Sequence, residues 1–331
     1  MGRGYIPAFG ACTLLLLSLG CSRGKEAGTT GGVSPGKRPD VYYEISALGS
    51  ASYFYDHKEG LRLAGEYFGV ETQYKGPSDL NIQAMIQAIE LAVAQKPAGI
   101  MVIGFEESLN DAVNKAVDAG IPVVTLDSDL PNSRRVTFVG TGNYDAGFRG
   151  GAKLAELVGG KGKVAILTKV GQPNLEERVR GYRDALAKSP GIEVVRVADT
   201  KSEVPMAAQV AAAVLSAVPD LAGIGCVEAS GGAGAATAVK EANLAGKIRV
   251  VAMDRDNDIL TYIDNGVIDA TVVQQTMLMP YYGLMVLYQL NHHDIPISSD
   301  NKAAGVAATP QVIDTGTILV DRSNCRAFMR K

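Results

Sequence analysis

The stretch AGIMVIGFEESLNDAVNKAVDAGIPVVTLDSD, residues 98–129, contains two apolar runs that enclose a helical pattern. AGIMVIGF (98–105) and IPVVTLDSD (121–129) are almost continuously apolar over the length of a strand, whereas LNDAVNKAVDAG (109–120) carries its apolar residues at helical spacing. A strand that is apolar on both faces is typical of a parallel sheet covered by helices on both sides. This stretch therefore predicts one strand–helix–strand unit of an α/β fold.

The same alternation runs along most of the chain from residue 40 onward. Further strands are predicted at VYYEIS (41–46), GVETQYK (69–75), VTFVG (136–140), KVAILTKV (163–170), IEVVRVA (192–198), LAGIGCVE (221–228), IRVVAMD (248–254) and DATVVQQ (269–275). Helices are expected between the strands, with patterns at 54–68 and 81–95 as further examples. The strands form two successive series, and the second begins at residue 163. Two such series predict an α/β protein with two doubly wound parallel-sheet lobes.

The composition is that of a globular protein, and it argues against binding to nucleic acid and against a membrane-spanning segment in the body of the chain. Of the 331 residues, 47% are hydrophobic and 20% are charged, and the formal net charge is −3. No block of lysine and arginine marks a phosphate-tracking surface, so nucleic acid is not an expected partner. No apolar run after the first 20 residues is long enough to span a membrane, so any membrane attachment is expected at the N-terminus.

The N-terminus has the pattern of an export signal. Residues 1–20 carry an early cation followed by an apolar run. SLGC resembles the cleavage box of bacterial lipoproteins, in which the cysteine after the cut carries the lipid, although Ser18 stands where that box usually has leucine. The mature chain would then begin at a lipidated Cys21, with a flexible linker over 21–39. A simple secretory signal and a chance match to the lipoprotein box are the alternatives.

Of the four cysteines, two are expected in the folded part of the protein. Cys12 would be lost with the signal and Cys21 would become the anchor, which leaves Cys226 and Cys325. These two either pair in an oxidising compartment or remain free, and the apolar run around Cys226 favours a buried free thiol. Neither has CxxC or Cys/His spacing, so no metal site is expected.

Polar and aromatic side chains gather where the predicted strands end. In a doubly wound sheet, ligands bind in the crevice beyond the C-terminal ends of the strands. The residues at these ends, or in the loops beside them, are Tyr53, Phe54, Asp127, Ser128, Asn174, Arg178, Glu228, Asp254 and Gln274. Each of them alone could be a helix cap or a turn residue. Together they suit a small polyhydroxylated ligand, because carboxylates accept hydroxyl protons, Arg and Gln donate, and aromatic rings cover C–H faces.

Five motifs then follow one another in a specific order and spacing. They are IPVVTLDSD (121–129), FVGTGNYDAGFRGG (138–151), NLEERVRGYRDAL (174–186), VVAMD (250–254) and ATVVQQ (270–275). With these motifs, the chain from residue 40 to 320 resembles the ribose-binding-protein-like members of the type I periplasmic binding protein family. Members of that family are the substrate-binding proteins of bacterial ABC sugar importers.

The resemblance implies two lobes that are joined by three crossovers and close on a ligand by hinge motion. The crossovers are expected near 141–143, 274–276 and 313–316. The N-terminal lobe would comprise 40–141 and 276–314, and the C-terminal lobe would comprise 142–275 and 315–331.

The resemblance also implies roles for the strand-end residues. The family's aromatic clamp falls on Tyr53 and Phe54, its aspartates on Asp127 and Asp254, its guanidinium on Arg178, and its glutamine near the hinge on Gln274. In two places the chain departs from ribose binders, because Ser128 stands where they have arginine and Glu228 where they commonly have asparagine. The crevice would then hold three acids and one arginine, which are Asp127, Glu228, Asp254 and Arg178. This balance predicts a neutral sugar or polyol rich in hydroxyl donors, or a ligand that carries an amine.

By this resemblance, the protein is expected to be an extracytoplasmic, monomeric binding protein that needs no cofactor and delivers a sugar or polyol to an ABC-transporter permease, and the SLGC box adds the expectation of a lipid anchor. A ligand sensor for a chemoreceptor or a sensor kinase would have the same body. An enzyme is disfavoured, because GCVEASGGAGAATA (225–238) follows a dinucleotide-binding fingerprint poorly at Thr237, and neither GxSxG nor HExxH occurs. A transcription regulator is disfavoured by the export signal.

Overall fold

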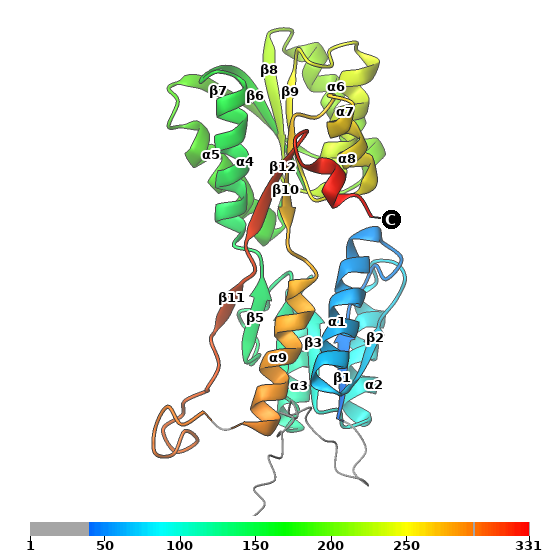
Figure 1. Ribbon diagram of the computed structural model, residues 1–331, viewed down its shortest axis with the longest axis vertical. Coiled ribbons are helices and arrows are strands. Elements are labelled where there is room, and N and C mark those ends of the chain that lie inside the picture. Colours follow the sequence, from blue (N-terminus) through cyan, green and yellow to red (C-terminus); the bar gives the residue numbers. More distant parts are fainter. Residues whose placement is uncertain (1–39, 294, 331) are drawn as a thin grey trace, which may run out of the picture.

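The computed structural model describes residues 40–293 and 295–330. The predicted signal peptide (1–20), Cys21 and the linker (21–39) lie outside these residues. In the described part, two α/β lobes follow one another along the long axis of the molecule (Figure 1). None of the helices in these two ranges is long and apolar enough to cross a membrane.

The N-terminal lobe is built on a sheet with the strand order β11-β5-β4-β3-β1-β2. Its strands are β1 (Val41–Ile45), β2 (Glu71–Lys75), β3 (Gly99–Ile103), β4 (Val123–Leu126), β5 (Thr137–Gly140) and β11 (Val312–Asp314). Its helices are α1 (Tyr55–Phe68), α2 (Ile82–Ala94), α3 (Asn110–Asp118) and α9 (Leu278–His292), with short 3-10 helices at Ser52–Phe54 and Glu107–Leu109. Neighbouring strands of this sheet are parallel.

The C-terminal lobe is built on a second sheet with the order β12-β10-β9-β8-β6-β7. Its strands are β6 (Lys161–Thr168), β7 (Gly191–Asp199), β8 (Leu221–Cys226), β9 (Arg249–Met253), β10 (Ala270–Gln274) and β12 (Thr317–Asp321). Its helices are α4 (Asn143–Leu157), α5 (Pro173–Leu186), α6 (Val204–Ala217), α7 (Ala229–Glu241) and α8 (Asn257–Asp264), with a 3-10 helix at Cys325–Phe328. The edge strand β12 runs antiparallel to β10, while the other neighbouring pairs are parallel.

The local sequence explains these elements. All five residues of β3 are buried, as expected for an apolar strand covered on both faces. Asn81 begins α2, because its side-chain oxygen accepts a hydrogen bond from the Ala84 amide at 2.9 Å. A Cβ atom at Gly234 would lie 2.5 Å from the Ala207 Cβ, so this glycine lets α7 pack closely on α6. Two mostly parallel α/β sheets confirm the predicted fold class.

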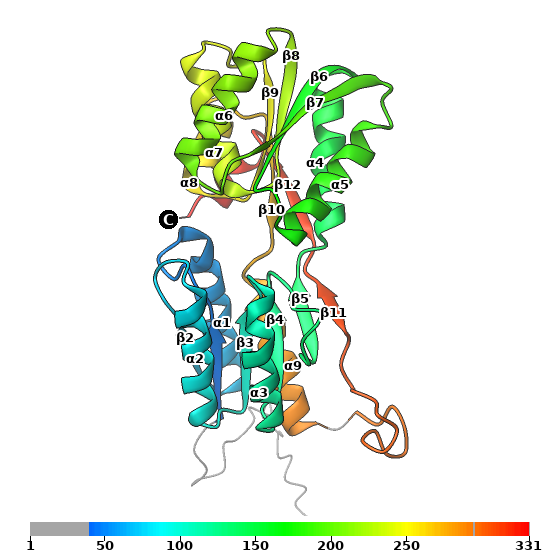
Figure 2. The ribbon, with the colours of Figure 1, turned by 180° about the vertical axis from the view of Figure 1, so that it is seen from behind.

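Three segments connect the two sheets, as the rear view shows (Figure 2). They are residues 141–142 between β5 and α4, 275–277 between β10 and α9, and 315–316 between β11 and β12. The chain leaves the C-terminal ends of β5 and β10 to enter the opposite lobe. The strands parallel to these two therefore end at the same edges, so that the carboxyl ends of both sheets face each other.

Candidate functional site

Two aspartates occupy equivalent places at the carboxyl ends of the two sheets. Asp127 follows β4 and Asp254 follows β9, and both have left-handed backbone conformations, with φ of 61° and 68°. Their backbone amides donate to a neighbouring strand in the same way, to Val139 O at 3.0 Å and to Val272 O at 2.9 Å. A non-glycine residue with positive φ is uncommon, and such residues cluster at functional sites. The matched pair therefore marks the crevice between the lobes as the candidate site.

In the N-terminal lobe, Tyr53 is fixed against the first of these aspartates. Its hydroxyl donates to Asp127 Oδ1 at 2.6 Å. Burial raises the pKa of the Tyr53 hydroxyl well above its usual value, and the negative charges of Asp127 and Asp254 raise it further. The Tyr53 hydroxyl is therefore bonded to the aspartate of its own lobe and is also subject to the negative charge of the aspartate of the other lobe.

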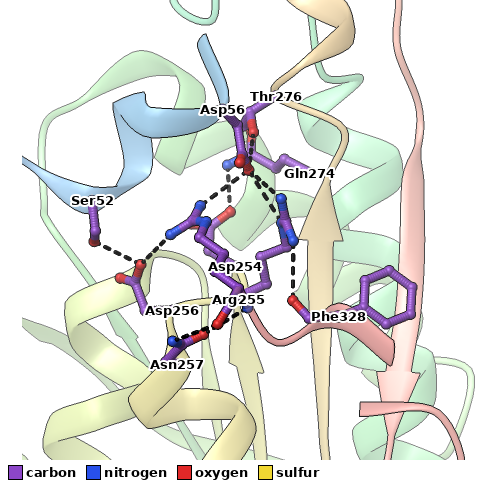
Figure 3. Close-up of polar contacts among 10 residues, drawn as sticks. Ser52, Asp56, Asp254, Arg255, Asp256, Asn257, Gln274, Thr276 and Phe328 are labelled. Atoms are coloured by element: carbon purple, nitrogen blue, oxygen red, sulfur yellow. Dashed lines mark hydrogen bonds and ion pairs between the residues drawn. The ribbon is translucent and has the colours of Figure 1, made fainter. Parts of the chain in front are cut away.

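In the C-terminal lobe, Arg178 is buried and its guanidinium makes three hydrogen bonds. Nε donates to Asn143 Oδ1 at 2.8 Å, Nη1 to Val227 O at 3.0 Å and Nη2 to Gln274 Oε1 at 2.7 Å. Gln274 Nε2 in turn donates to Asp254 Oδ1 at 2.9 Å (Figure 3). Arg178 therefore fixes the orientation of the Gln274 amide, and this amide holds the Asp254 carboxyl group.

The Asp254 carboxyl group is difficult to ionise in this setting. Burial raises its pKa to about 7, against the opposing effects of the Arg178 charge and the hydrogen bond from Gln274. Near neutral pH the group is therefore divided between an ionised form, which only accepts hydrogen bonds, and a neutral form, which also donates one.

Aromatic rings form one wall of the site. Tyr53 and Phe54 meet edge to face, with ring centroids 5.1 Å apart, and Phe54 is only 3% exposed. Phe105, on the loop after β3, meets Phe54 edge to face at 6.2 Å. Phe54 thus supports the ring of Tyr53 from behind, and Phe105 extends the apolar wall.

A cavity of about 520 Å³ opens between the lobes, and of the aspartate, arginine, glutamine and aromatic side chains described for the site only Phe105 lines it. Phe105 and Ser128 line it from the N-terminal lobe, and Asn143, Gln172 and Asn174 line it from the C-terminal lobe. A volume of this size falls in the usual range for small-molecule sites. The cavity is therefore large enough for a small ligand that touches both lobes.

Glu228 has a different environment from the other residues predicted for the site. Its Oε1 accepts from Thr200 Oγ1 at 2.9 Å, and its Oε2 accepts from the Ser230 amide at 2.9 Å and also from the Ser230 hydroxyl. It is the N-cap residue of α7 and is 8% exposed. Both carboxylate oxygens are thus used inside the C-terminal lobe.

Several polar residues near the site were not predicted from the sequence. Asn143 stands at the start of α4 and bonds Arg178, but nothing in a helix start separates this role from that of an ordinary first-turn residue. Glu44 and His57 are fully buried behind the aromatic wall, with His57 Nδ1 and Glu44 Oε1 2.7 Å apart. The available signal for this pair was a glutamate within the apolar run VYYEIS.

Most of the chain is similar to known binding proteins. A family model described as periplasmic binding protein domain matches residues 44–293. The D-ribose/D-allose-binding protein of Pseudomonas aeruginosa is 26% identical over 269 residues, which cover 79% of this chain and 81% of that protein. The xylitol-binding protein of Mycolicibacterium smegmatis is 26% identical over 288 residues, covering 86% of this chain and 78% of that protein.

Two solved structures are similar over nearly all of the described residues. The sugar-binding protein of a sugar ABC transporter from Bacillus halodurans has a TM-score of 0.83 and 36% identity, covering 88% of this chain and 100% of that one. An arabinose-binding protein from Geobacillus stearothermophilus has a TM-score of 0.81 and 33% identity, with coverage of 88% and 100%. Both similarities extend over the two lobes and the crevice between them.

Proposed function

Since the chain belongs to the periplasmic binding protein domain family, among the sugar-binding proteins of ABC importers, we propose that it captures a small sugar or polyol between its lobes and delivers it to a membrane permease. The family consists of solute-binding proteins rather than enzymes, and its members work outside the cytoplasm. The observation that carries the proposal is the pair of matched aspartates, one at the carboxyl ends of each sheet, whose negative charges both raise the pKa of the Tyr53 hydroxyl.

In the proposed site, some residues accept hydrogen bonds from the ligand, others donate them, and aromatic rings form an apolar wall. Asp127 and Asp254 accept hydrogen bonds from hydroxyl groups of the sugar, and Arg178 and Gln274 hold Asp254 in place while presenting donors. The remaining contacts are the aromatic face of Tyr53, which the buried Phe54 supports, and the cavity-lining side chains of Ser128 and Asn174. A ligand that touches both lobes favours their closed arrangement through its higher affinity for that state.

The proposed ligand is an uncharged, hydroxyl-rich molecule of five or six carbons, with an amine-bearing sugar as the alternative. Relatives are named for D-ribose and D-allose, for xylitol and for arabinose. An acceptor-rich crevice suits such molecules, because each hydroxyl that loses water needs an acceptor for its proton. A buried Asp254 with a pKa of about 7 also suits a neutral ligand, since the group can enter the bound state without a counter-charge.

Glu228 is proposed to act through α7 rather than by direct contact, because both of its oxygens already accept hydrogen bonds. It keeps the crevice-facing end of α7 in place. Its strand-end position predicts a direct acceptor for the ligand instead, and the sugar affinity of Glu228→Ala distinguishes the two roles.

We also propose how the chain is divided between the lobes and how its N-terminal end is attached. The N-terminal lobe is taken as 40–141 with 276–314, and the C-terminal lobe as 142–275 with 315–331. Cys21 is proposed to carry a lipid that anchors a monomeric protein to a membrane, with the linker before residue 40 as a spacer.

Titration calorimetry of the purified protein tests the ligand class. The panel comprises D-ribose, D-allose, L-arabinose, xylitol, myo-inositol and D-glucosamine. We expect micromolar or tighter binding of at least one neutral sugar or polyol, and a loss of at least about tenfold in affinity in Asp127→Ala, which removes an acceptor from the crevice. If no member of the panel binds, or if Asp127→Ala binds as tightly as the unmodified protein, the proposed site is wrong.

A further inference from the structure

A second polar cluster crosses between the lobes beside the candidate site (Figure 3). Its centre is Asp56, in the first turn of α1, which is only 5% exposed. Asp56 Oδ2 accepts from Arg255 Nη2 at 2.7 Å and Nε at 3.1 Å, from Arg330 Nη2 at 3.0 Å and from Thr276 Oγ1 at 3.1 Å. One carboxylate of the N-terminal lobe is thus bonded by two guanidinium groups.

Both guanidinium groups belong to the C-terminal lobe. Arg255 follows Asp254 after β9, and its Nη1 donates to Phe328 O at 3.0 Å. Arg330 lies in the C-terminal tail, where its amide donates to Asn257 Oδ1 at 3.0 Å and its carbonyl accepts from Asn257 Nδ2 at 3.3 Å. The tail is therefore fastened to α8, and the two arginines form a fixed pair of donors for Asp56.

A second bridge beside the first completes the charge balance. Ser52 Oγ, from the N-terminal lobe, donates to Asp256 Oδ1 at 2.8 Å, and Arg330 Nη1 lies 3.4 Å from the same oxygen. Two acids thus face two arginines. Burial alone would raise the pKa of Asp56, but the bonds from Arg330 and Arg255 outweigh it and lower the pKa, so the carboxylate is ionised near neutral pH.

The positions of these residues connect the cluster to the site. Asp56 is three residues after Tyr53, on the turn that carries the aromatic wall. Arg255 is the next residue in the sequence after Asp254, which faces the crevice. The C-terminal end of the chain lies beside the start of α1, on the side of the molecule away from β11 (Figure 1). Hinge opening that moves α1 away from this tail would have to break the bonds to Asp56.

We propose that Asp56, Arg255 and Arg330 form a cross-lobe latch, which holds the lobes together without ligand and fixes the turn that carries Tyr53. The latch favours the closed arrangement, so less of the ligand's binding free energy is needed to bring the lobes together. Its effect on sugar affinity rests on the proposed function, whereas its effect on lobe separation does not.

Small-angle X-ray scattering of the ligand-free protein tests the latch directly. Arg330→Ala removes one guanidinium at the end of the chain, where a folding defect is least expected, and Asp56→Asn removes the shared acceptor charge. Arg326→Ala is the matched control, because Arg326 is in the same C-terminal segment and bonds Asp264 at 3.0 and 3.3 Å within one lobe. We expect a larger radius of gyration for the first two variants and no change for the control.

Calorimetry with the tightest-binding member of the sugar panel gives the second readout. We expect Arg330→Ala to bind about tenfold more weakly than the unmodified protein, and Arg326→Ala to bind equally well. Unchanged radii of gyration in both Arg330→Ala and Asp56→Asn would overturn the latch, whatever the affinities are. If the unmodified protein binds no sugar, the proposed function fails, and the scattering result alone decides on the latch.

Discussion

The pKa of Asp254 makes the stability of the protein depend on pH in a defined window. Burial raises the pKa of this carboxyl group from its usual 3.8 to about 7. Between about pH 4 and pH 7 the unfolded chain has released this proton while the folded protein keeps it, so stability falls as the pH rises. With about 1.4 kcal/mol for each pKa unit, the loss is on the order of 4 kcal/mol. Asp254→Asn has no such proton, and its urea-unfolding free energy should lack this part of the slope between pH 4 and pH 8. Parallel pH profiles for the two proteins would contradict the assignment.

His57 offers a separate pH signature in the N-terminal lobe. Burial lowers the pKa of its imidazole, but the Glu44 carboxylate at 2.7 Å outweighs burial and raises the pKa above the usual 6.5. The chain has only 3 histidines, so a proton NMR titration can resolve them. One imidazole should keep its proton to a higher pH than an unperturbed histidine, and its resonance should be absent from His57→Gln. The stability from this pair is complete below pH 6.5 and is lost as the pH rises through the raised pKa. A titration of His57 at or below pH 6.5 would refute this prediction.

At this scale, the sequence indicates which residues stand at strand ends but not which groups they bond. The strand-end rule selects Asp127 and Asp254, and in the structure the first accepts a hydrogen bond from Tyr53 while the charge of the second also raises the pKa of that hydroxyl. It also selects Glu228, whose oxygens are used within its own lobe instead. Strand position is a one-dimensional property, whereas the partner of a carboxylate depends on the side chains that the fold brings beside it.

Helix α7 illustrates how one residue contributes at the level of an element. Glu228 caps its first turn through the Ser230 amide and also accepts from the buried Thr200 hydroxyl. Glu228→Ala should therefore lower the unfolding free energy by about 1–2 kcal/mol, measured by urea denaturation. Its sugar affinity should change less than threefold, in contrast to Asp127→Ala. A much larger loss of affinity at unchanged stability would restore Glu228 as a direct contact.

The elements that the sequence predicts best are those buried on both faces. The apolar run at 98–105 contains β3, whose five residues are all buried. By contrast, β11 and β12 were not predicted, because β11 has only three residues, two of them exposed, and β12 is mostly half-buried. Such short edge strands carry too little apolar pattern to be recognised, and the antiparallel direction of β12 follows from the third connection between the lobes.

At the scale of the whole molecule, the cross-lobe latch is the feature that could least be predicted from the sequence. Asp56 and Arg330 are 274 residues apart in the sequence, and neither stands in a motif. Their contact depends on three connections that return the chain to the same side of the molecule. The order of strands and motifs was enough to predict two lobes, because it depends on local patterns. The relative placement of the side chains at the lobe edges depends on the whole fold.

Attachment to a membrane is a further proposed property of the whole molecule. Substitutions of two cysteines in the N-terminal segment, Cys21 and Cys12, test it. If Cys21 carries the lipid, Cys21→Ser should move the protein from the membrane fraction to the soluble extracytoplasmic fraction of the expressing bacterium. The lost lipid chains supply the binding free energy, at about 0.8 kcal/mol for each buried methylene group. Cys12→Ser is the matched control and should stay in the membrane fraction, because Cys12 would be removed with the signal. Mass spectrometry of the mature N-terminus should find a lipidated Cys21 in the control. A Cys21→Ser protein that remains with the membrane would show that another feature anchors it.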